Sequence, residues 1–234
     1  MIEFYIEQAS TYAHEIDNVI NVIGVITTFW WALTTAVFFY FIWRFRYREG
    51  VPSQYVTGKE KHLKRWVNIP HYLIILCDMV VIVAAVRVWY MVKQDLPTSD
   101  DMRTVRIIGQ QWAWSFEHPG PDGKLGGPDD LAAIEDNIYT VDELHTTVDT
   151  LYHYKLEARD VMHSFSVPVF RLKQDALPGR VITGWWQATK TGEWDIQCAE
   201  MCGIGHGIMA ARIFVETPEE HEVWMQAQAA LAKK

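Results

Sequence analysis

The sequence predicts a membrane-anchored all-β protein, in which a transmembrane hairpin of two helices precedes an external Greek-key β-sandwich or barrel. Three observations predict it: two long, nearly uncharged runs, a basic connector between them, and short apolar segments separated by turn signals in the remainder. Of the 234 residues, 50% are hydrophobic and 13% aromatic, which excludes disordered, collagen-like and disulfide-scaffold proteins. The formal net charge of −8 argues against nucleic acid as a partner.

Two segments are predicted to be transmembrane helices. Residues 19–43 form a run of 25 residues without a charge, enough to cross a hydrocarbon core of about 30 Å at about 1.5 Å per residue. Residues 66–92 contain only Asp78 and Arg87 as charged residues, and Trp66 lies near one end, as in interfacial aromatic belts. The 18 residues before the first run contain no Lys or Arg, so we expect no cleavable leader.

The connector between the two runs, residues 44–65, determines the predicted orientation. It carries seven basic residues against two acidic ones, which the positive-inside rule assigns to the cytoplasmic or matrix side. Residues 1–18 then form an external N-terminal segment and residues 93–234 an external domain, on a bacterial plasma membrane or a mitochondrial inner membrane. The external domain carries 22 acids and 13 bases, a net charge of −9, which favours a cationic partner, although solubility alone also explains it.

Short apolar or aromatic segments between turn signals predict the external sandwich or barrel. The predicted strands are residues 104–108, 112–116, 137–141, 148–158, 165–170, 181–188, 193–197 and 210–215. The proline- and glycine-rich segment 119–128 is predicted to be a surface loop. Thr217, Pro218 and Glu220 combine an N-cap, a proline at the first helical position and a capping-box acid, so a terminal helix is expected over about 218–232.

Residues 198–209, CAEMCGIGHGIM, place four soft or borderline donors within twelve residues. A thiolate, an imidazole and a thioether suit copper better than magnesium or calcium, and the interspersed glycines let the loop curl so that the donors converge. The order of Cys202, His206 and Met209 is typical of a cupredoxin copper site, which needs another His from a different strand. For Cys198 and Cys202 in isolation, a disulfide explains the spacing equally well.

The distant histidine has five candidates in the external domain. They are His118, His145, His153, His163 and His221. His163 is the best placed, since it lies at the turn between an alternating strand and the next apolar run, whereas the default for any one histidine is a hydrogen-bonded structural role. A second thiolate in the loop lets two sulfurs bridge two copper ions, and sharing an electron between them suits electron transfer rather than substrate activation.

Four segments resemble subunit II of the haem-copper cytochrome c oxidases: QWAW at 111–114, DVMHSF at 160–165, DALPGR at 175–180 and CAEMCGIGHGIM at 198–209. The resemblance covers both predicted spans and the whole external domain. The last motif is otherwise shared mainly with nitrous oxide reductase, which lacks such a two-helix anchor. The resemblance implies a cupredoxin-like external domain that carries a binuclear copper centre, CuA.

The resemblance also implies a role for each residue of the motifs. The side-chain ligands of CuA would be His163, Cys198, Cys202, His206 and Met209, with Glu200 binding through its backbone carbonyl. The Glu200 side chain would point toward a Mg or Mn ion shared with subunit I, and its alternative is a solvated loop acid. The haems would lie only in the partner subunit.

Two further residues match positions of electron transfer and docking. Trp112 corresponds to the aromatic residue through which electrons arrive, and its alternative is a buried strand aromatic. Asp160 corresponds to an acidic position of the docking patch for cytochrome c, which agrees with the acidic domain. The sequence departs from the family at Ala113, where Tyr is usual, and at Arg159, where Glu is frequent.

Several residues near or within the spans bear on proton uptake, on partner subunits or on packing. Leu63 stands where many members carry the Glu that opens a proton pathway into subunit I, so nearby Glu60 and His62 are candidates to replace that carboxylate. Unaltered proton uptake in both Glu60→Ala and His62→Ala would contradict this. Asp78 is expected to face another subunit or to bond locally to the backbone, since a charge in the membrane is costly. Arg87 is expected to reach the outer interface, and Cys77 to pack.

The expected function is therefore the electron-accepting subunit of a proton-translocating cytochrome c oxidase, which receives electrons from cytochrome c or another c-type or cupredoxin donor. Its expected partners are subunit I, subunit III and the lipid bilayer. Two alternatives remain: the CuA subunit of a haem-copper nitric oxide reductase, and a membrane-tethered copper-delivery protein with exposed, exchangeable ligands. A quinol oxidase subunit is disfavoured because the set of copper ligands is complete.

Overall fold

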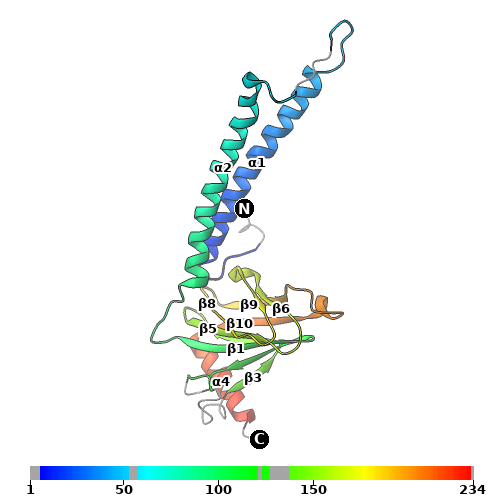
Figure 1. Cartoon of the computed structure of the whole chain (residues 1–234). Coiled ribbons are helices and arrows are strands. Elements are labelled where there is room, and N and C mark those ends of the chain that lie inside the picture. Colours follow the sequence, from blue (N-terminus) through cyan, green and yellow to red (C-terminus); the bar gives the residue numbers. More distant parts are fainter. Residues whose placement is uncertain (1–5, 53–56, 121–122, 127–136, 233–234) are drawn as a thin grey trace. The chain divides into compact units, whose positions relative to one another are not determined.

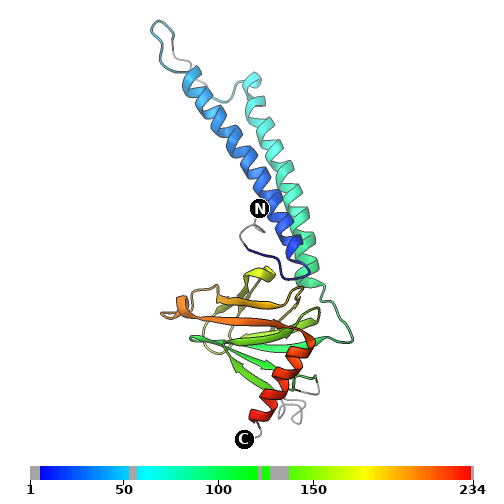
Figure 2. The same cartoon turned by 180° about the vertical axis from the view of Figure 1, so that it is seen from behind.

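The computed structural model describes residues 6–52, 57–120, 123–126 and 137–232 (Figures 1 and 2). The chain divides into a sandwich unit, residues 1–16 and 90–234, and a helical unit, residues 17–89. The surface loop predicted over 119–128 falls partly outside the described residues, as do parts of the N-terminal segment and of the connector.

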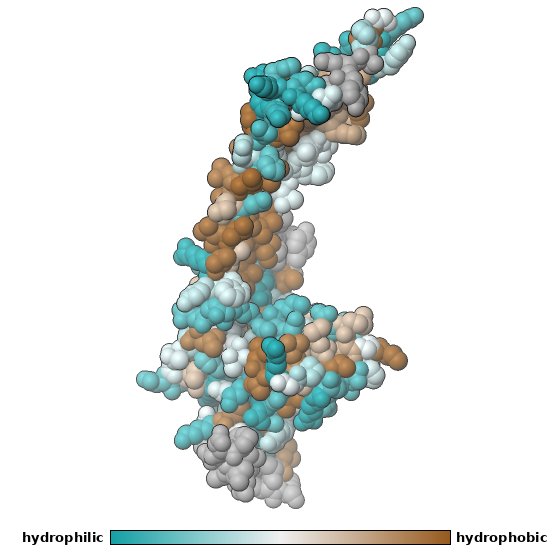
Figure 3. All heavy atoms as spheres, in the orientation of Figure 1, coloured by the Kyte–Doolittle hydropathy of each residue, from teal (hydrophilic) through white to brown (hydrophobic). Residues whose placement is uncertain are grey.

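The helical unit consists of α1 (Ala13–Arg44) and α2 (Lys61–Trp89), which continues into a short π-helical turn, η2 (Tyr90–Gln94). Both helices begin before the uncharged runs, because a helix continues past the hydrocarbon core into its polar boundary. Each is long and apolar enough to cross a membrane, and the most apolar window of each is unburied. Hydrophobic residues gather along the helices and hydrophilic residues at the end that bears the connector (Figure 3). Such exposed apolar surface calls for lipid or a partner.

Asp78 lines a groove between α1 and α2 together with Thr27 and Thr34. Its side chain is exposed, and among the described residues it makes no hydrogen bond or ion pair. At the start of α2, the Glu60 carboxylate accepts hydrogen bonds from the backbone N–H of Thr57 (3.2 Å) and from the Thr57 hydroxyl (2.8 Å). The carboxylate of Glu60 thus closes the turn that precedes the helix.

The sandwich unit contains two five-stranded sheets. The first has the order β3-β2-β1-β5-β8 and the second β4-β10-β9-β6-β7. The bounds are β1 (Arg103–Gln110), β2 (Ala113–His118), β3 (Ile138–Val141), β4 (Glu143–Thr147), β5 (Leu151–Ala158), β6 (His163–Val167), β7 (Leu172–Ala176), β8 (Ile182–Gln187), β9 (Gly192–Cys198) and β10 (Ala210–Glu216). Two pairs, β1–β5 and β4–β10, are parallel and the others antiparallel. A terminal helix, α4 (Pro218–Ala232), contacts β3, β4 and β10.

The core between the sheets is rich in aromatic side chains. Trp114, Phe116 and Phe165 are fully buried and meet edge to face. Tyr152 stacks on Trp186 with ring centroids 5.6 Å apart. Burial of these rings removes apolar surface from water and so stabilises the sandwich, and it fixes the strands that carry the site described below.

Three strand predictions are corrected by the structure. β4 and β7 were not predicted, because ELHTT and LKQDA lack the apolar alternation of a buried strand. Both are edge strands, which need fewer apolar residues. The strand predicted over 165–170 ends at Val167, and a 3-10 turn, η3 (Pro168–Phe170), follows because proline has no N–H to give to a ladder.

The segment before α1 belongs to the sandwich unit. The N–H of Ala9 donates to the carbonyl of Val169 (2.9 Å), and the carbonyl of Ala9 accepts from the N–H of Thr189 (2.9 Å). The carboxylate of Glu7 accepts a bond from Trp194 Nε1 at 2.7 Å. The chain therefore leaves the sandwich, passes through the helical unit and returns to the sandwich.

The predicted capping box of α4 is confirmed. The hydroxyl of Thr217 accepts from the N–H of Glu220 (3.2 Å), and the Glu220 carboxylate accepts from the N–H of Thr217 (2.9 Å). Reciprocal bonds of this kind satisfy two of the free N–H groups at a helix start. They fix the direction in which α4 leaves β10.

Candidate metal centre

Two strands and one loop bring the predicted donors together. β6 begins at His163 and β9 ends at Cys198, and the two strands pair through Phe165 and Cys198. The loop 199–209 then returns to β10 and contains a single 3-10 turn, η4 (His206–Ile208). The N–H of Cys198 donates to the carbonyl of Met209 (3.1 Å), so the two ends of the loop are tied together.

The donor atoms converge within the loop. The Cys198 and Cys202 sulfurs are unbonded and 3.7 Å apart, and Cys198 Sγ lies 3.9 Å from His163 Nδ1. Cys202 Sγ lies 3.7 Å from His206 Nδ1 and 3.8 Å from Met209 Sδ. His163, Cys198 and Cys202 are buried, and their donor atoms all lie within 4.8 Å of one another. This group of three is the one such cluster within the described part of the chain.

The backbone of the loop offers a further donor. The carbonyl oxygen of Glu200 lies 3.3 Å from Cys198 Sγ, whereas the side chain of Glu200 is half-buried. Two thiols, two imidazoles, a thioether and a carbonyl thus surround one small volume. This is a soft donor set, and it fits copper better than a hard cation. The burial of Cys198, Cys202 and Met209 also excludes water from the volume.

The protonation of the thiols depends on their burial. Burial, and then the neighbouring Cys198 thiol, raise the pKa of Cys202 to about 11. The sulfur of Cys202 is therefore a thiol at neutral pH in the metal-free chain. Because a thiolate is the form that binds metal, metal binding here has to displace a proton.

Asp160 holds the imidazole of His163 in place. Its Oδ1 accepts a bond from His163 Nε2 at 2.8 Å, and its Oδ2 accepts from the N–H of Gln111 at 2.7 Å. Burial acts to raise the pKa of Asp160, but the bonds from His163, Gln111 and Val161 outweigh it and hold the pKa below its usual value. With the proton on Nε2, His163 presents its Nδ1 lone pair to the sulfurs, the arrangement typical of metal-binding histidines.

Trp112 belongs to the turn between β1 and β2, and its half-exposed ring packs against the loop 199–209. Its Nε1 and the Nε2 of Gln111 both donate to the carbonyl of Cys202, at 3.3 and 2.8 Å. The loop has room for the ring because Gly203 and Gly205 have no side chains: a Cβ on Gly205 would lie 2.5 Å from Trp112 Cδ2. An indole at 40% exposure thus contacts the backbone of a donor residue.

The structure separates the five candidate histidines. His163 alone joins the cysteines. His118, His145 and His221 lie in a second group beside α4, and His153 Nε2 bonds to the carbonyl of Pro97 at 2.7 Å. Sequence reasoning missed that Asp160 bonds to His163; the spacing Asp-x-x-His was the available signal. It also missed that Gly203 and Gly205 make room for Trp112, which no sequence pattern indicates.

Comparison with known proteins adds to this geometry. Residues 103–217 match the family model described as the periplasmic domain of cytochrome c oxidase subunit II. The chain is 31% identical over 232 residues to the alternative cytochrome c oxidase subunit 2 of Bradyrhizobium diazoefficiens, with 93% of this chain and 81% of that one covered. It is 28% identical over 247 residues to cytochrome c oxidase subunit 2 of Cereibacter sphaeroides, with 93% and 76% covered.

A solved structure is also similar. The periplasmic domain of subunit II of cytochrome oxidase from Bradyrhizobium japonicum aligns with a TM-score of 0.48 and 26% identity. The alignment covers 57% of this chain and 96% of that domain.

Proposed function

The chain belongs to the family of cytochrome c oxidase subunit II, and on this premise we propose that it is the electron-accepting subunit of a terminal respiratory oxidase. In this role it takes single electrons from cytochrome c, or from another c-type or cupredoxin donor. It delivers them to haem in subunit I, where oxygen is reduced to water. The observation that carries the proposal is the buried group of His163, Cys198 and Cys202 beside the half-exposed ring of Trp112.

A binuclear copper centre fits the donors. His163, Cys198, Cys202, His206 and Met209 would hold it through their side chains, and Glu200 through its carbonyl. Copper bound there would supply a one-electron couple shared between two ions and two sulfurs. The burial of the donors supports this role over copper delivery, since a delivery protein needs exposed, exchangeable ligands.

The chain itself keeps the site rigid and dry. Backbone bonds such as Met209 N–H to the His206 carbonyl (3.3 Å) and His206 N–H to the Gly203 carbonyl (3.2 Å) hold the loop, and Asp160 holds His163. Donors that cannot relocate need little rearrangement when the charge of the site changes. Trp112 joins this rigid loop to the surface, which supports its role as the residue through which electrons arrive.

Partner contacts follow from charge and position. The net charge of −9 on residues 93–234 supports a basic donor, which would be steered toward the acidic domain. The side chain of Asp160 is one-third exposed although it bonds to His163. A role in docking cytochrome c would therefore come in addition to holding the imidazole of His163 in place. The half-buried carboxylate of Glu200 is the proposed ligand of a Mg or Mn ion shared with subunit I. Subunit III is a further proposed partner.

The membrane arrangement is also part of the proposal. Residues 6–12 bond to the sandwich, so both ends of the helical unit connect to one side of the membrane, as two spans require. The seven basic residues of the connector support a cytoplasmic or matrix location for it. The sandwich and both termini would then lie on the periplasmic or intermembrane side. Exposed Asp78 would meet another subunit within the bilayer.

Proton uptake near Leu63 needs another group. The backbone N–H of Glu60 and the hydroxyl and N–H of Thr57 lower the pKa of Glu60 to about 2, which keeps it ionised at neutral pH. A group that stays ionised is poorly suited to carry a proton. Of the two candidates, His62 is therefore the better one.

The experiment measures electron acceptance directly. The full chain in detergent is loaded with copper and mixed with reduced cytochrome c, whose oxidation is followed in a stopped-flow instrument. We expect fast oxidation by the wild type and a loss of at least tenfold in Trp112→Leu, with no change in Tyr139→Leu, an exposed aromatic on β3. If the copper-loaded wild type oxidises neither cytochrome c nor any other c-type donor that is tried, the proposal is overturned.

A further inference from the structure

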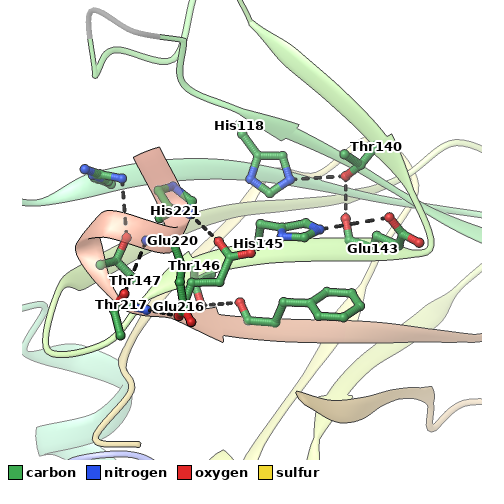
Figure 4. A network of polar contacts seen from close by, with 12 residues as sticks. His118, Thr140, Glu143, His145, Thr146, Thr147, Glu216, Thr217, Glu220 and His221 are labelled. Atoms are coloured by element: carbon green, nitrogen blue, oxygen red, sulfur yellow. Dashed lines mark hydrogen bonds and ion pairs between the residues drawn. The ribbon is translucent and has the colours of Figure 1, made fainter. Parts of the chain in front are cut away.

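A second cluster of buried histidines lies where α4 covers β4 and β10 (Figure 4). This histidine cluster consists of His118, His145, Glu216, His221 and Trp224. All three histidines are at most 8% exposed. None of the five residues is a donor of the metal centre, and the proposed electron transfer does not use them.

The ring of His145 is fixed on three sides. It stacks between Phe214 and Trp224, with centroids 4.6 and 4.2 Å away and planes within 13° of parallel. Its Nδ1 hydrogen-bonds to Glu216 Oε1 at 2.8 Å. The other carboxylate oxygen of Glu216 accepts a hydrogen bond from His221 Nδ1 at the same distance. Burial acts to raise the pKa of Glu216, but the bonds from His145 and His221 outweigh it and lower the pKa to about 2. An ionised carboxylate only accepts, so Nδ1 of His145 carries the hydrogen.

The other ring nitrogen of His145 has no hydrogen-bond partner among the residues that the structure describes. His145 Nε2 is buried, and the carboxylate oxygen Glu143 Oε2 lies 4.0 Å from it, on a side chain that is 61% exposed. A metal ion between His145 Nε2 and the Glu143 carboxylate would accept a lone pair from each. Two donors on one tetrahedral zinc ion lie about 3.4 Å apart, so a small movement of the Glu143 side chain suffices.

The strands supply a third donor from the other sheet. Glu143 and His145 are two residues apart on β4 and so lie on the same side of that strand. His118 is on β2. The Thr140 hydroxyl donates to the Glu143 carbonyl, so it accepts from the N–H at His118 Nε2, at 3.1 Å. In Figure 4 the His118 and His145 rings both point toward the side of Thr140 and Glu143. Burial, and then His145 and His221, lower the pKa of His118 to about 3, so it is a neutral imidazole.

We propose that Glu143, His145 and His118 form a second metal site, for a divalent transition-metal ion of the Zn²⁺ type. Imidazole and carboxylate donors suit Zn²⁺, whereas the thiolate-rich loop suits copper. Glu216 is the positioning residue, because a carboxylate on the far nitrogen of a metal-binding histidine fixes its ring and its tautomer. The bound ion ties β2 of the first sheet to β4 of the second.

The site is open and adjustable. Its three donors do not all lie within 4.8 Å of one another, in contrast to the thiol cluster. His118 has to release Thr140 and move its ring hydrogen from Nε2 to Nδ1, and Glu143 has to move inward. We therefore expect an ion that exchanges with solvent and is removed by a chelator, and that stabilises the sandwich when present, because it binds only the folded chain.

The test uses the full chain with its copper loaded, so that the thiols are occupied. The protein is passed over a chelating resin and titrated with ZnCl₂ by calorimetry, and the unfolding temperature is measured with and without Zn²⁺. We expect one Zn²⁺ per chain, a higher unfolding temperature, and at least tenfold weaker binding in His145→Gln and Glu143→Gln. Glu193→Gln removes the same charge from an exposed site on β9 and should bind as the wild type does.

Zinc X-ray absorption locates the ion. Nitrogen and oxygen neighbours at about 2.0–2.2 Å support the proposed site, whereas sulfur at about 2.3 Å would put the zinc on the cysteines and overturn the proposal. Wild-type protein that takes up no Zn²⁺ would also overturn it. Equal affinity in Glu143→Gln, whose exposed side chain is not needed for folding, contradicts the ligand set even if His145→Gln fails to fold.

Discussion

The metal centre and the histidine cluster are built on the same pair of groups and differ in what surrounds the pair. In each, a buried imidazole bonds at 2.8 Å to a carboxylate: His163 to Asp160, and His145 to Glu216. At the metal centre the free ring nitrogen faces two buried thiols on a closed loop, whereas at the histidine cluster it faces an exposed carboxylate. The carboxylate sets the direction of the ring, and the facing donors decide which metal suits it.

The tryptophans of the two regions sharpen this contrast. Trp112 is 40% exposed and donates its N–H to the carbonyl of Cys202, so it joins the metal centre to the surface. Trp224 stacks flat on His145 and helps to close the histidine cluster under α4. One indole presents an exposed ring beside the thiols, and the other provides packing.

The largest expected effect comes from removing a thiol from the metal centre. Cys202→Ser replaces a soft donor by a hard hydroxyl, so the chain should lose the capacity to hold two copper ions. Copper analysis together with paramagnetic resonance checks this. Cys77→Ser changes a cysteine within α2 and should leave both readings unchanged. A normal copper content in Cys202→Ser would show that the second sulfur is not a ligand.

The next largest effect tests how much the Asp160 carboxylate, which bonds to His163, contributes to copper affinity. Asp160→Asn weakens the bond to His163, and loss of such a partner costs about 10–100-fold in metal affinity. Copper affinity is measured by competition with a chelator of known strength. Asp195→Asn, an exposed aspartate paired with Arg212, is the matched control. Unchanged affinity in Asp160→Asn would mean that packing, including the contact of Trp114 with His163, holds the ring by itself.

The contact of Trp112 with the loop is tested by a single methyl group. Gly205→Ala places a Cβ against the indole and should lift the ring from the loop, slowing oxidation of cytochrome c by a factor on the order of ten. Gly207→Ala is matched in chemistry and lies in the same loop, but its Cβ would meet nothing within 4 Å. Similar rates in the two variants would show that the contact of the Trp112 ring with the loop is not needed for oxidation of cytochrome c.

The smallest effect concerns the histidine cluster in acid. His118 has a pKa of about 3 in the folded chain against 6.5 in its ordinary state, so only the unfolded chain binds a proton between these values. The free energy of unfolding should therefore fall as the pH is lowered from about 6.5 to about 3, by about 1.4 kcal/mol per pH unit from this residue. Denaturant titrations in His118→Gln should show a shallower dependence. An identical pH dependence of the free energy of unfolding in His118→Gln would show that other residues cause the loss of stability in acid.

The two regions also differ in how far sequence reasoning reaches them. Most donors of the metal centre lie within residues 198–209, so local spacing predicts them, and the turn position of His163 adds the fifth side chain. The histidine cluster draws on β2, β4, β10 and α4, and no local pattern links those segments. β4 itself was missed because ELHTT reads as polar. The contact of Gly205 with Trp112 depends on how two distant segments are placed, which residue types do not encode locally, whereas the spacing Asp-x-x-His was a local signal for the bond of Asp160 to His163.

Copper analysis and electron paramagnetic resonance of the full, copper-loaded chain decide whether the centre is binuclear. We expect two copper ions per chain and a mixed-valence signal whose hyperfine structure comes from two nuclei. A single copper per chain, or Cu(I) that a chelator removes readily, would contradict the binuclear centre and would favour a copper-delivery protein.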